Sequence, residues 1–177
     1  YISAFAQGSW LLPTGGGVAS PMTMSGGVFV GRTCSFDTLA WDPKAPEVLG
    51  GSLSATNAFT GFYLMGEATI PFASAACLLS ASAGAGARLY YSDPEWDFIG
   101  VTMGARLDAS VSGEFLCLVK LKGSAFLQGG LTGPNSLFFF DGGAELEGRL
   151  GICPFCVTFD PSIRATYVEG GGWDISY

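Results

Sequence analysis

Residues 100–118 read "GVTMGARLDASVSGEFLCL", and their side chains alternate between two kinds. From Val101 to Phe115 every odd position is apolar or small. The even positions over the same run are Thr102, Gly104, Arg106, Asp108, Ser110, Ser112 and Glu114. Because successive side chains of a β-strand point to opposite faces of a sheet, this period of two predicts a long strand with one apolar face and one polar face.

Three further runs alternate in the same way. Their apolar or small stripes start at Phe62, Cys77 and Phe138, and polar or charged residues occupy the opposite faces. No stretch has a convincing helical period of 3.6 residues. The sequence therefore predicts an all-β fold, an antiparallel long-stranded meander of about eight to nine strands that forms a sandwich or a barrel.

Turn-forming stretches separate these runs. The breaks are "SDPEWD" (92–97), "TGPN" (132–135), "SGE" (112–114), "CPFC" (153–156) and "DPS" (160–162), and "WDPKAPE" (41–47) is a longer loop. The length of 177 residues predicts a single β domain over residues 1–177. Residues 1–12 are either the first strand of its sheet or an exchangeable N-terminal strand that adds to the sheet of a neighbouring subunit. Residues 62–168 hold three loosely related hairpins, whose glycines are Gly66, Gly104 and Gly143.

The composition contains few charged side chains that could cover a water-exposed surface. Hydrophobic residues make up 49% and charged residues 13%, where about 25% is usual for a domain. We therefore expect lipid or copies of the chain to cover part of its surface. The net charge of −7 argues against nucleic acid, and the absence of histidine removes the commonest general base and transition-metal ligand. The composition predicts that the protein is not an enzyme.

The cysteines and the first residue indicate export. Five cysteines in so short a chain fit an oxidising compartment, and their odd number leaves at least one without an internal disulfide partner. The sequence starts at Tyr1 rather than at Met, which is expected of a processed mature form or of a fragment. No stretch approaches 18 consecutive apolar residues, so the sequence predicts no membrane-spanning helix. The expected location is extracellular or at the cell surface, with the outer membrane as the alternative.

Three motifs raise the question of chemistry. Cys153 and Cys156 form the one Cys-x-x-Cys pair, but no helix follows them, so we predict a structural disulfide or buried thiols rather than a redox couple. Glu145 and Glu147 share one strand face with Arg149, which favours a salt-bridge ladder over an acid–base pair. The acidic loop 92–97 lacks the spacing of a calcium-binding EF-hand. The sequence predicts no catalytic residue, no metal site and no cofactor.

A strand with one apolar face must cover that face, and assembly with copies of the same chain is the first hypothesis. Low charge, abundant glycine and alanine and spare cysteine are typical of a secreted structural protein, a homo-oligomer that self-assembles into an extracellular filament, tube or surface layer. The expected partners are copies of the chain, and a membrane is expected only under the alternative. The candidate assembly-face residues are Ile2, Trp10, Val101, Met103, Leu107 and Val111.

A small outer-membrane β-barrel is the alternative hypothesis. Arg88, Arg106 and Asp108 lie on the polar faces of the predicted strands, where they pair inside a narrow lumen if the apolar faces meet lipid. The last five residues, "WDISY" (173–177), alternate Trp173, Ile175 and Tyr177. This ending resembles the C-terminal signature of bacterial outer-membrane barrels, and the resemblance implies a membrane-embedded β-barrel.

Overall fold

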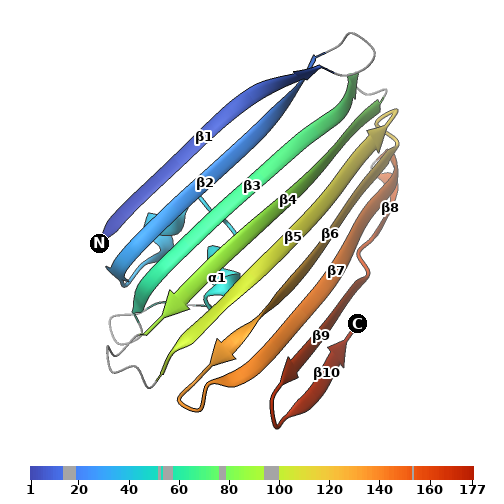
Figure 1. The fold of residues 1–177 in the computed structure, drawn as a ribbon. Helices are drawn as coiled ribbons and strands as arrows, with labels where there is room; N and C mark the ends of the chain where they lie inside the picture. Colours follow the sequence, from blue (N-terminus) through green and yellow to red (C-terminus); the bar gives the residue numbers. More distant parts are fainter. Residues whose placement is uncertain (14–18, 52, 54–57, 76–78, 94–99, 153) are drawn as a thin grey trace.

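The computed structural model describes residues 1–13, 19–51, 53, 58–75, 79–93, 100–152 and 154–177. Ten antiparallel strands form one sheet, which runs as a meander from the N-terminal to the C-terminal edge (Figure 1). The strands are β1 (Ile2–Pro13), β2 (Ala19–Thr33), β3 (Phe59–Ala75), β4 (Leu79–Ser92), β5 (Thr102–Phe115), β6 (Val119–Thr132), β7 (Leu137–Ile152), β8 (Phe155–Phe159), β9 (Ser162–Val168) and β10 (Gly172–Ser176). The predicted all-β antiparallel meander is confirmed, and the sheet is open rather than closed.

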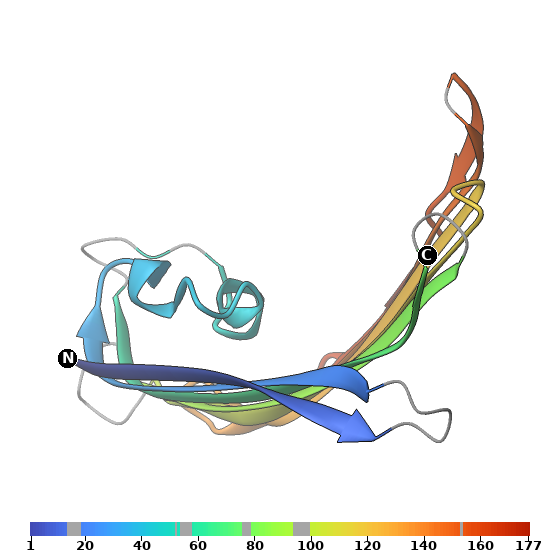
Figure 2. The same ribbon diagram turned by 90° about the horizontal axis from the view of Figure 1, so that it is seen from above.

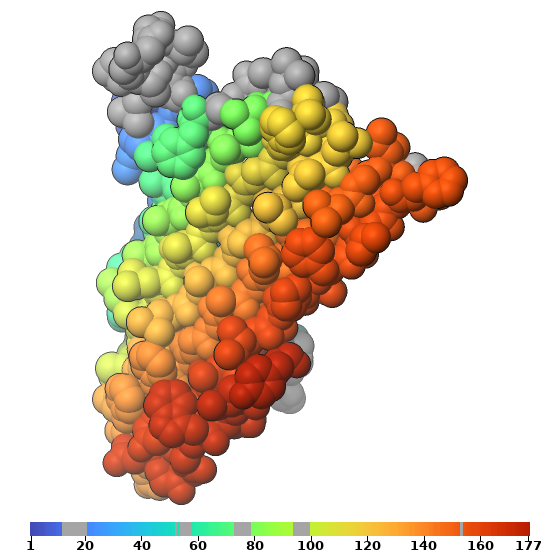
Figure 3. Space-filling view, turned by 90° about the vertical axis from the view of Figure 1, so that its right-hand side faces the viewer, coloured from blue at the N-terminus to red at the C-terminus, as the bar shows by residue number. Residues whose placement is uncertain are grey.

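The sheet is nine strands wide, because β8 and β9 lie end to end along β7. Gly148 pairs with Phe159 in β8, and Glu145 pairs with Ser162 in β9, so both strands keep one register against β7. The amide of Leu146 donates to the carbonyl of Pro161 at 2.9 Å and continues the ladder between them. Pro161 has no amide hydrogen, which explains the interruption. Figure 3 looks onto the C-terminal side of the sheet, where these strands lie in the orange to red part.

The sheet bends into a curved wall with one concave and one convex face (Figure 2). The segment between β2 and β3 folds back onto the concave face and contains two short helices, η1 (Phe36–Leu39) and α1 (Ala45–Val48). Ser35 caps η1, since its hydroxyl accepts from the amide of Asp37 at 3.1 Å. Pro46 lies in the first turn of α1, where a missing amide hydrogen costs no helical bond.

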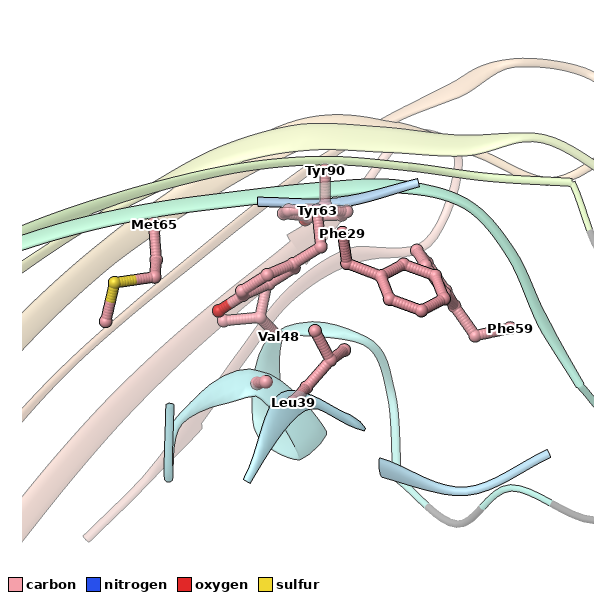
Figure 4. Close-up of a cluster of buried hydrophobic side chains, with 8 residues drawn as sticks. Phe29, Leu39, Val48, Phe59, Tyr63, Met65 and Tyr90 are labelled. Atoms are coloured by element: carbon pink, nitrogen blue, oxygen red, sulfur yellow. The ribbon is translucent and has the colours of Figure 1, made fainter. Parts of the chain in front are cut away.

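The only cluster of buried apolar side chains among the described residues lies between this segment and the wall (Figure 4). Leu39, Ala45 and Val48 of the segment are at most 6% exposed. They pack against strand residues of β2, β3 and β4, which are Phe29, Phe59, Tyr63, Met65 and Tyr90. Gly27 leaves the space that the Trp41 ring occupies, because a Cβ at Gly27 would overlap that ring. The core is therefore confined to one end of the concave face.

The two faces of the wall have opposite chemistry. Residues paired across neighbouring strands share a face, so the contact of Arg88 with the segment identifies the concave one. In β3 to β10 every charged strand residue falls on that concave face in the described part of the chain: Glu67, Arg88, Arg106, Asp108, Glu114, Lys120, Lys122, Asp141, Glu145, Glu147, Arg149, Arg164 and Asp174. The convex face carries the apolar stripes predicted from the sequence.

Two local predictions differ from the structure. The predicted turn at 112–114 is wrong, because β5 continues to Phe115. The turn follows at Leu116 and Cys117, two non-glycine residues with φ of 51° and 56°. Leucine and cysteine rarely adopt this left-handed conformation, so their residue types do not predict a turn there. The loop 41–47 contains part of α1. In the described part of the chain, no helix is long and apolar enough to cross a membrane.

Candidate functional site

A cluster of charged side chains joins the segment to the concave face of the wall. Asp42, between η1 and α1, faces Arg88 of β4. The Arg88 guanidinium donates from Nε to Asp42 Oδ2 at 2.7 Å and from Nη2 to Asp42 Oδ1 at 3.0 Å. Both side chains are fully buried. This bidentate ion pair fixes the middle of the segment to the wall.

Arg88 has further acceptors on both neighbouring strands. Its Nη1 donates to Asp108 Oδ2 of β5, and its Nη2 donates to Glu67 Oε2 of β3 at 3.2 Å. A side chain at position 86 would come within 2.8 Å of the Arg88 Nη1 atom, so Gly86 gives the guanidinium its space. Three carboxylates from three elements therefore surround one buried cation, which lowers the desolvation cost of burying it.

Asp42 is held in its ionised form. Tyr63 donates its hydroxyl to Asp42 Oδ2 at 2.6 Å, and the amide of Lys44 donates to Asp42 Oδ1 at 3.0 Å. Burial by itself raises the pKa of Asp42, but the hydrogen bonds from Arg88, Tyr63 and the Lys44 amide outweigh it. The result is a pKa below the ordinary value of 3.8.

A second arginine fixes α1. Arg106 of β5 contacts Glu47 through Nη1 at 3.1 Å and donates from Nε to Asp108 Oδ1 at 2.8 Å. Lys44 Nζ lies 3.6 Å from the same Asp108. Arg106 is 3% exposed, and its guanidinium carbon lies 4.0 Å from the centre of the Phe126 ring. The segment is thus held by ion pairs on one side and by the apolar cluster on the other.

A third polar group lies further along the wall, on β6, β7 and β9. The Asp141 carboxylate accepts from Gln128 Nε2 at 2.8 Å, from Arg164 Nη2 at 2.6 Å and from the Thr166 hydroxyl at 3.1 Å. Asp141 is 3% exposed, and Arg164 also lies near the Phe126 ring, 5.5 Å from its centre. Since all of these residues belong to the strands, this group braces the wall itself.

Hollows follow one another along the concave face. The hollow between α1 and the wall has a volume of about 390 Å³ and is lined in part by Glu47, Tyr90, Gln128 and Asp141. Another hollow, of about 450 Å³, lies toward the opposite end of the strands, among Glu114, Lys120, Lys122, Glu147 and Arg149. The concave face is therefore a polar trough that the segment fills at one end only.

The candidate assembly-face residues lie together on the convex face, with one exception. Ile2 and Trp10 of β1 are 75% and 52% exposed. Met103, Leu107 and Val111 of β5 are 40%, 59% and 61% exposed. Val101 precedes β5 and is only partly exposed. β1 is the edge strand of the chain's own sheet and pairs with β2 from Ile2 to Pro13.

The other predicted residues have different outcomes. Cys156 is disulfide-bonded, as is Cys117, whereas Cys153 lies outside the described residues, so the predicted Cys153–Cys156 pair stays a prediction. Cys34 is exposed and free. Glu145 and Glu147 are exposed on the concave side of β7. Most of the acidic loop 92–97 also lies outside the described residues.

The ion pairs of this cluster tether the segment to the wall. Within the described residues, no group of three cysteine, aspartate or glutamate side chains is arranged to hold a metal ion. Every buried carboxylate of the cluster is engaged by an arginine, which leaves a binding or positioning role to these groups. No protein-family profile, curated protein or solved structure matches the chain.

Proposed function

We propose that this chain forms the wall of an outer-membrane-type β-barrel, with the convex face on lipid and the concave face lining a lumen. The segment between β2 and β3 then narrows that lumen at one end. The observation that carries the proposal is the separation of charge: the charged side chains of β3 to β10 share the concave face, and the convex face of these strands is apolar. Among the described strands, Arg32 of β2 is the one charged residue that the register places on the convex face. The proposed location is the outer membrane, and the proposal assigns the chain no catalytic step.

The arrangement of aromatic residues on the convex face supports contact with lipid. Near the end that carries the segment, Trp173 packs against Phe140 and Tyr167 with ring centres 6.1 and 5.3 Å apart. Across the middle, one row of paired residues is small on most strands: Gly8, Ala68, Ala85, Ala109, Ala125 and Ala144. Toward the far end aromatic residues return with Trp10, Phe115 and Phe155. Membrane barrels place aromatic girdles at both interfaces in this way.

The height of the apolar band also fits a bilayer. From Met103 to Phe115 the apolar stripe of β5 covers 13 residues, and the 12 steps between the first and the last measure about 40 Å along an extended strand. Strands of membrane barrels are tilted by about 40°, which reduces this length to a height of about 30 Å. The hydrocarbon core of a typical bilayer is about 30 Å thick.

Assembly of copies without a membrane is the second candidate. It is favoured by the two edges of the sheet, since β1 at one side and β10 at the other have no further strand beside them in the described residues. In that case the convex face is covered by another subunit rather than by lipid, and the product is an extracellular filament, tube or layer.

The behaviour of the protein in detergent distinguishes the two candidate functions. We expect the native protein to require detergent for dispersion and to run at different positions on a gel before and after boiling, because a closed β-barrel resists unfolding by cold dodecyl sulfate. Electron microscopy of a detergent-free preparation is the matched experiment. Ordered filaments, tubes or sheets in that preparation, without a heat-dependent gel shift, would contradict the membrane proposal and support the second candidate.

A further inference from the structure

We propose that a second copy of this chain completes the barrel, with β1 of one copy paired to β10 of the next. This inference rests on the proposed function and names the partner that closes the wall. A sheet edge exposes a row of unpaired amide and carbonyl groups, and hydrocarbon offers them no partner. Both edges of a wall in a membrane must therefore meet another strand.

The edge at β1 lacks the features that keep an edge strand from pairing. From Ile2 to Leu12 it contains no charged residue and no proline. Its register against β2 is unbroken, so no bulge twists it away. Natural edges are protected by lysine, proline or bulges, and the absence of all three over this stretch is typical of a strand that has a neighbour.

The wall cannot close on itself while it holds the segment. The interior of an eight-stranded barrel is just wide enough for its own side chains, and diameter grows only in proportion to strand number. A nine-stranded cylinder is scarcely wider. The concave face carries Arg88, Arg106 and Tyr63, and above them η1 and α1 with their own side chains. A helix with side chains is about 10–12 Å across. The lumen therefore needs more strands than this wall provides.

A second copy matches the edges in both direction and chemistry. With β8 and β9 counted as one strand, directions alternate across the nine-strand wall, so β1 and β10 run the same way. Copies inserted in one orientation consequently join in a parallel seam. At that seam Trp10 of β1 and Trp173 of β10 are both on the convex face, so the apolar surface continues from copy to copy without a charged interruption.

The test uses pairs of chains that each carry one introduced cysteine, in a Cys34→Ser background that removes the exposed free thiol of Cys34. Gln7 of β1 and Ser176 of β10 lie in the same row of paired residues across the wall, on the concave face. Gln7→Cys, Ser3→Cys and Ser9→Cys each sample one position along β1. Each is co-expressed with Ser176→Cys, and the membrane fraction is oxidised and run on a gel without reductant. Ser110→Cys, in the middle of the wall, replaces the β1 variant in the matched control.

We expect at least one β1 variant to give a product of twice the chain mass with Ser176→Cys, and neither chain to give it alone or with Ser110→Cys. A chain carrying both Gln7→Cys and Ser176→Cys that cross-links at unchanged mass would overturn the proposal, because its own edges would then meet. The proposal would also be overturned if none of the variant pairs formed a cross-link and each detergent particle contained one copy of the chain. The heat-dependent gel shift is measured separately, so that the two proposals can fail independently. A barrel made of a single copy refutes this inference and leaves the membrane proposal intact. Cross-linked particles that form without detergent refute the membrane proposal and leave only the contact between β1 and β10.

Discussion

Arg106 and Leu107 are neighbours on β5 with opposite environments: the arginine is 3% exposed and the leucine 59%. In a water-soluble domain the reverse is usual, since charged residues are almost never fully buried and large apolar residues usually are. The contrast extends across the wall, because paired residues repeat it from strand to strand. This reversal favours the proposal that the polar face lines an interior and that lipid covers the apolar face.

The contrast also explains why the segment is attached through charges. On the concave face the strands offer buried cations, Arg88 and Arg106, and the segment supplies the matching carboxylates, Asp42 and Glu47. Removing one member of such a pair leaves the other buried without compensation. The polar face is therefore the side on which single substitutions have the largest effect.

The largest expected effect is that of Asp42→Ala. It leaves the fully buried Arg88 without its bidentate partner, and breaking a buried ion pair costs about 3–5 kcal/mol. The free energy of unfolding, measured by denaturant titration of the refolded protein, should fall by that amount. Asp37→Ala removes an exposed carboxylate of η1 and serves as the control, with a change within about 0.5 kcal/mol. Equal effects of the two variants would refute the tether.

Arginine at adjacent positions of β5 compares the two faces directly. Ala109 lies in the middle row of the convex face, and Ser110 lies beside it on the concave face. An arginine on the lipid side at the bilayer midplane costs about 2–4 kcal/mol, whereas the lumen tolerates polar groups. Unfolding from lipid vesicles should therefore show a loss of that size for Ala109→Arg and a loss of less than about 1 kcal/mol for Ser110→Arg. The opposite order would reverse the assignment of the faces.

A smaller loss of stability is expected when two adjacent glycines of β2 are replaced one at a time. A Cβ at Gly27 overlaps the Trp41 ring, whereas a Cβ at Gly26 meets only the Met65 carbonyl oxygen at 3.5 Å. Gly27→Ala should displace Trp41 from its stack on Phe5 and cost about 1–3 kcal/mol, as overpacking does. Gly26→Ala should leave the fluorescence of Trp41 unchanged. A shift in both variants, or in neither, would show that Trp41 does not rest on Gly27.

The smallest effect is expected from mild acid. Because the folded pKa of Asp42 lies below its ordinary value of 3.8, its contribution to stability is fully present above that value and is lost as the pH falls through the folded pKa. Trp41 fluorescence should therefore be constant from pH 7 to pH 5 and change only below about pH 4. Asp42→Asn should lack that acid transition. Release of the segment near pH 6 in the native protein would contradict the assignment to Asp42.

The faces of the wall could be predicted from the sequence because alternation is a local signal. Spacing alone predicts that Leu107 and Val111 lie on one apolar face, and the register confirms that they share it. The tether could not be predicted in this way, because Asp42 and Arg88 are 46 positions apart and nothing near "WDPKAPE" indicates its partner. Glycine between serine and glutamate predicts a turn at 112–114, but cross-strand pairing extends β5 through these residues. At these residues the pairing of β5 with β6 outweighs the local preference for a turn.

The most direct test of the central claim is fluorescence quenching in vesicles whose lipids carry a quencher within the acyl chains. Single-tryptophan variants retain either Trp173, which is 61% exposed on the convex face, or Trp41, which stacks on Phe5 on the concave side. If the convex face meets lipid, the acyl-chain quencher should strongly reduce the emission of Trp173 and leave that of Trp41 nearly unchanged. Quenching of Trp173 by aqueous iodide alone, with no effect of the lipid quencher, would contradict the account.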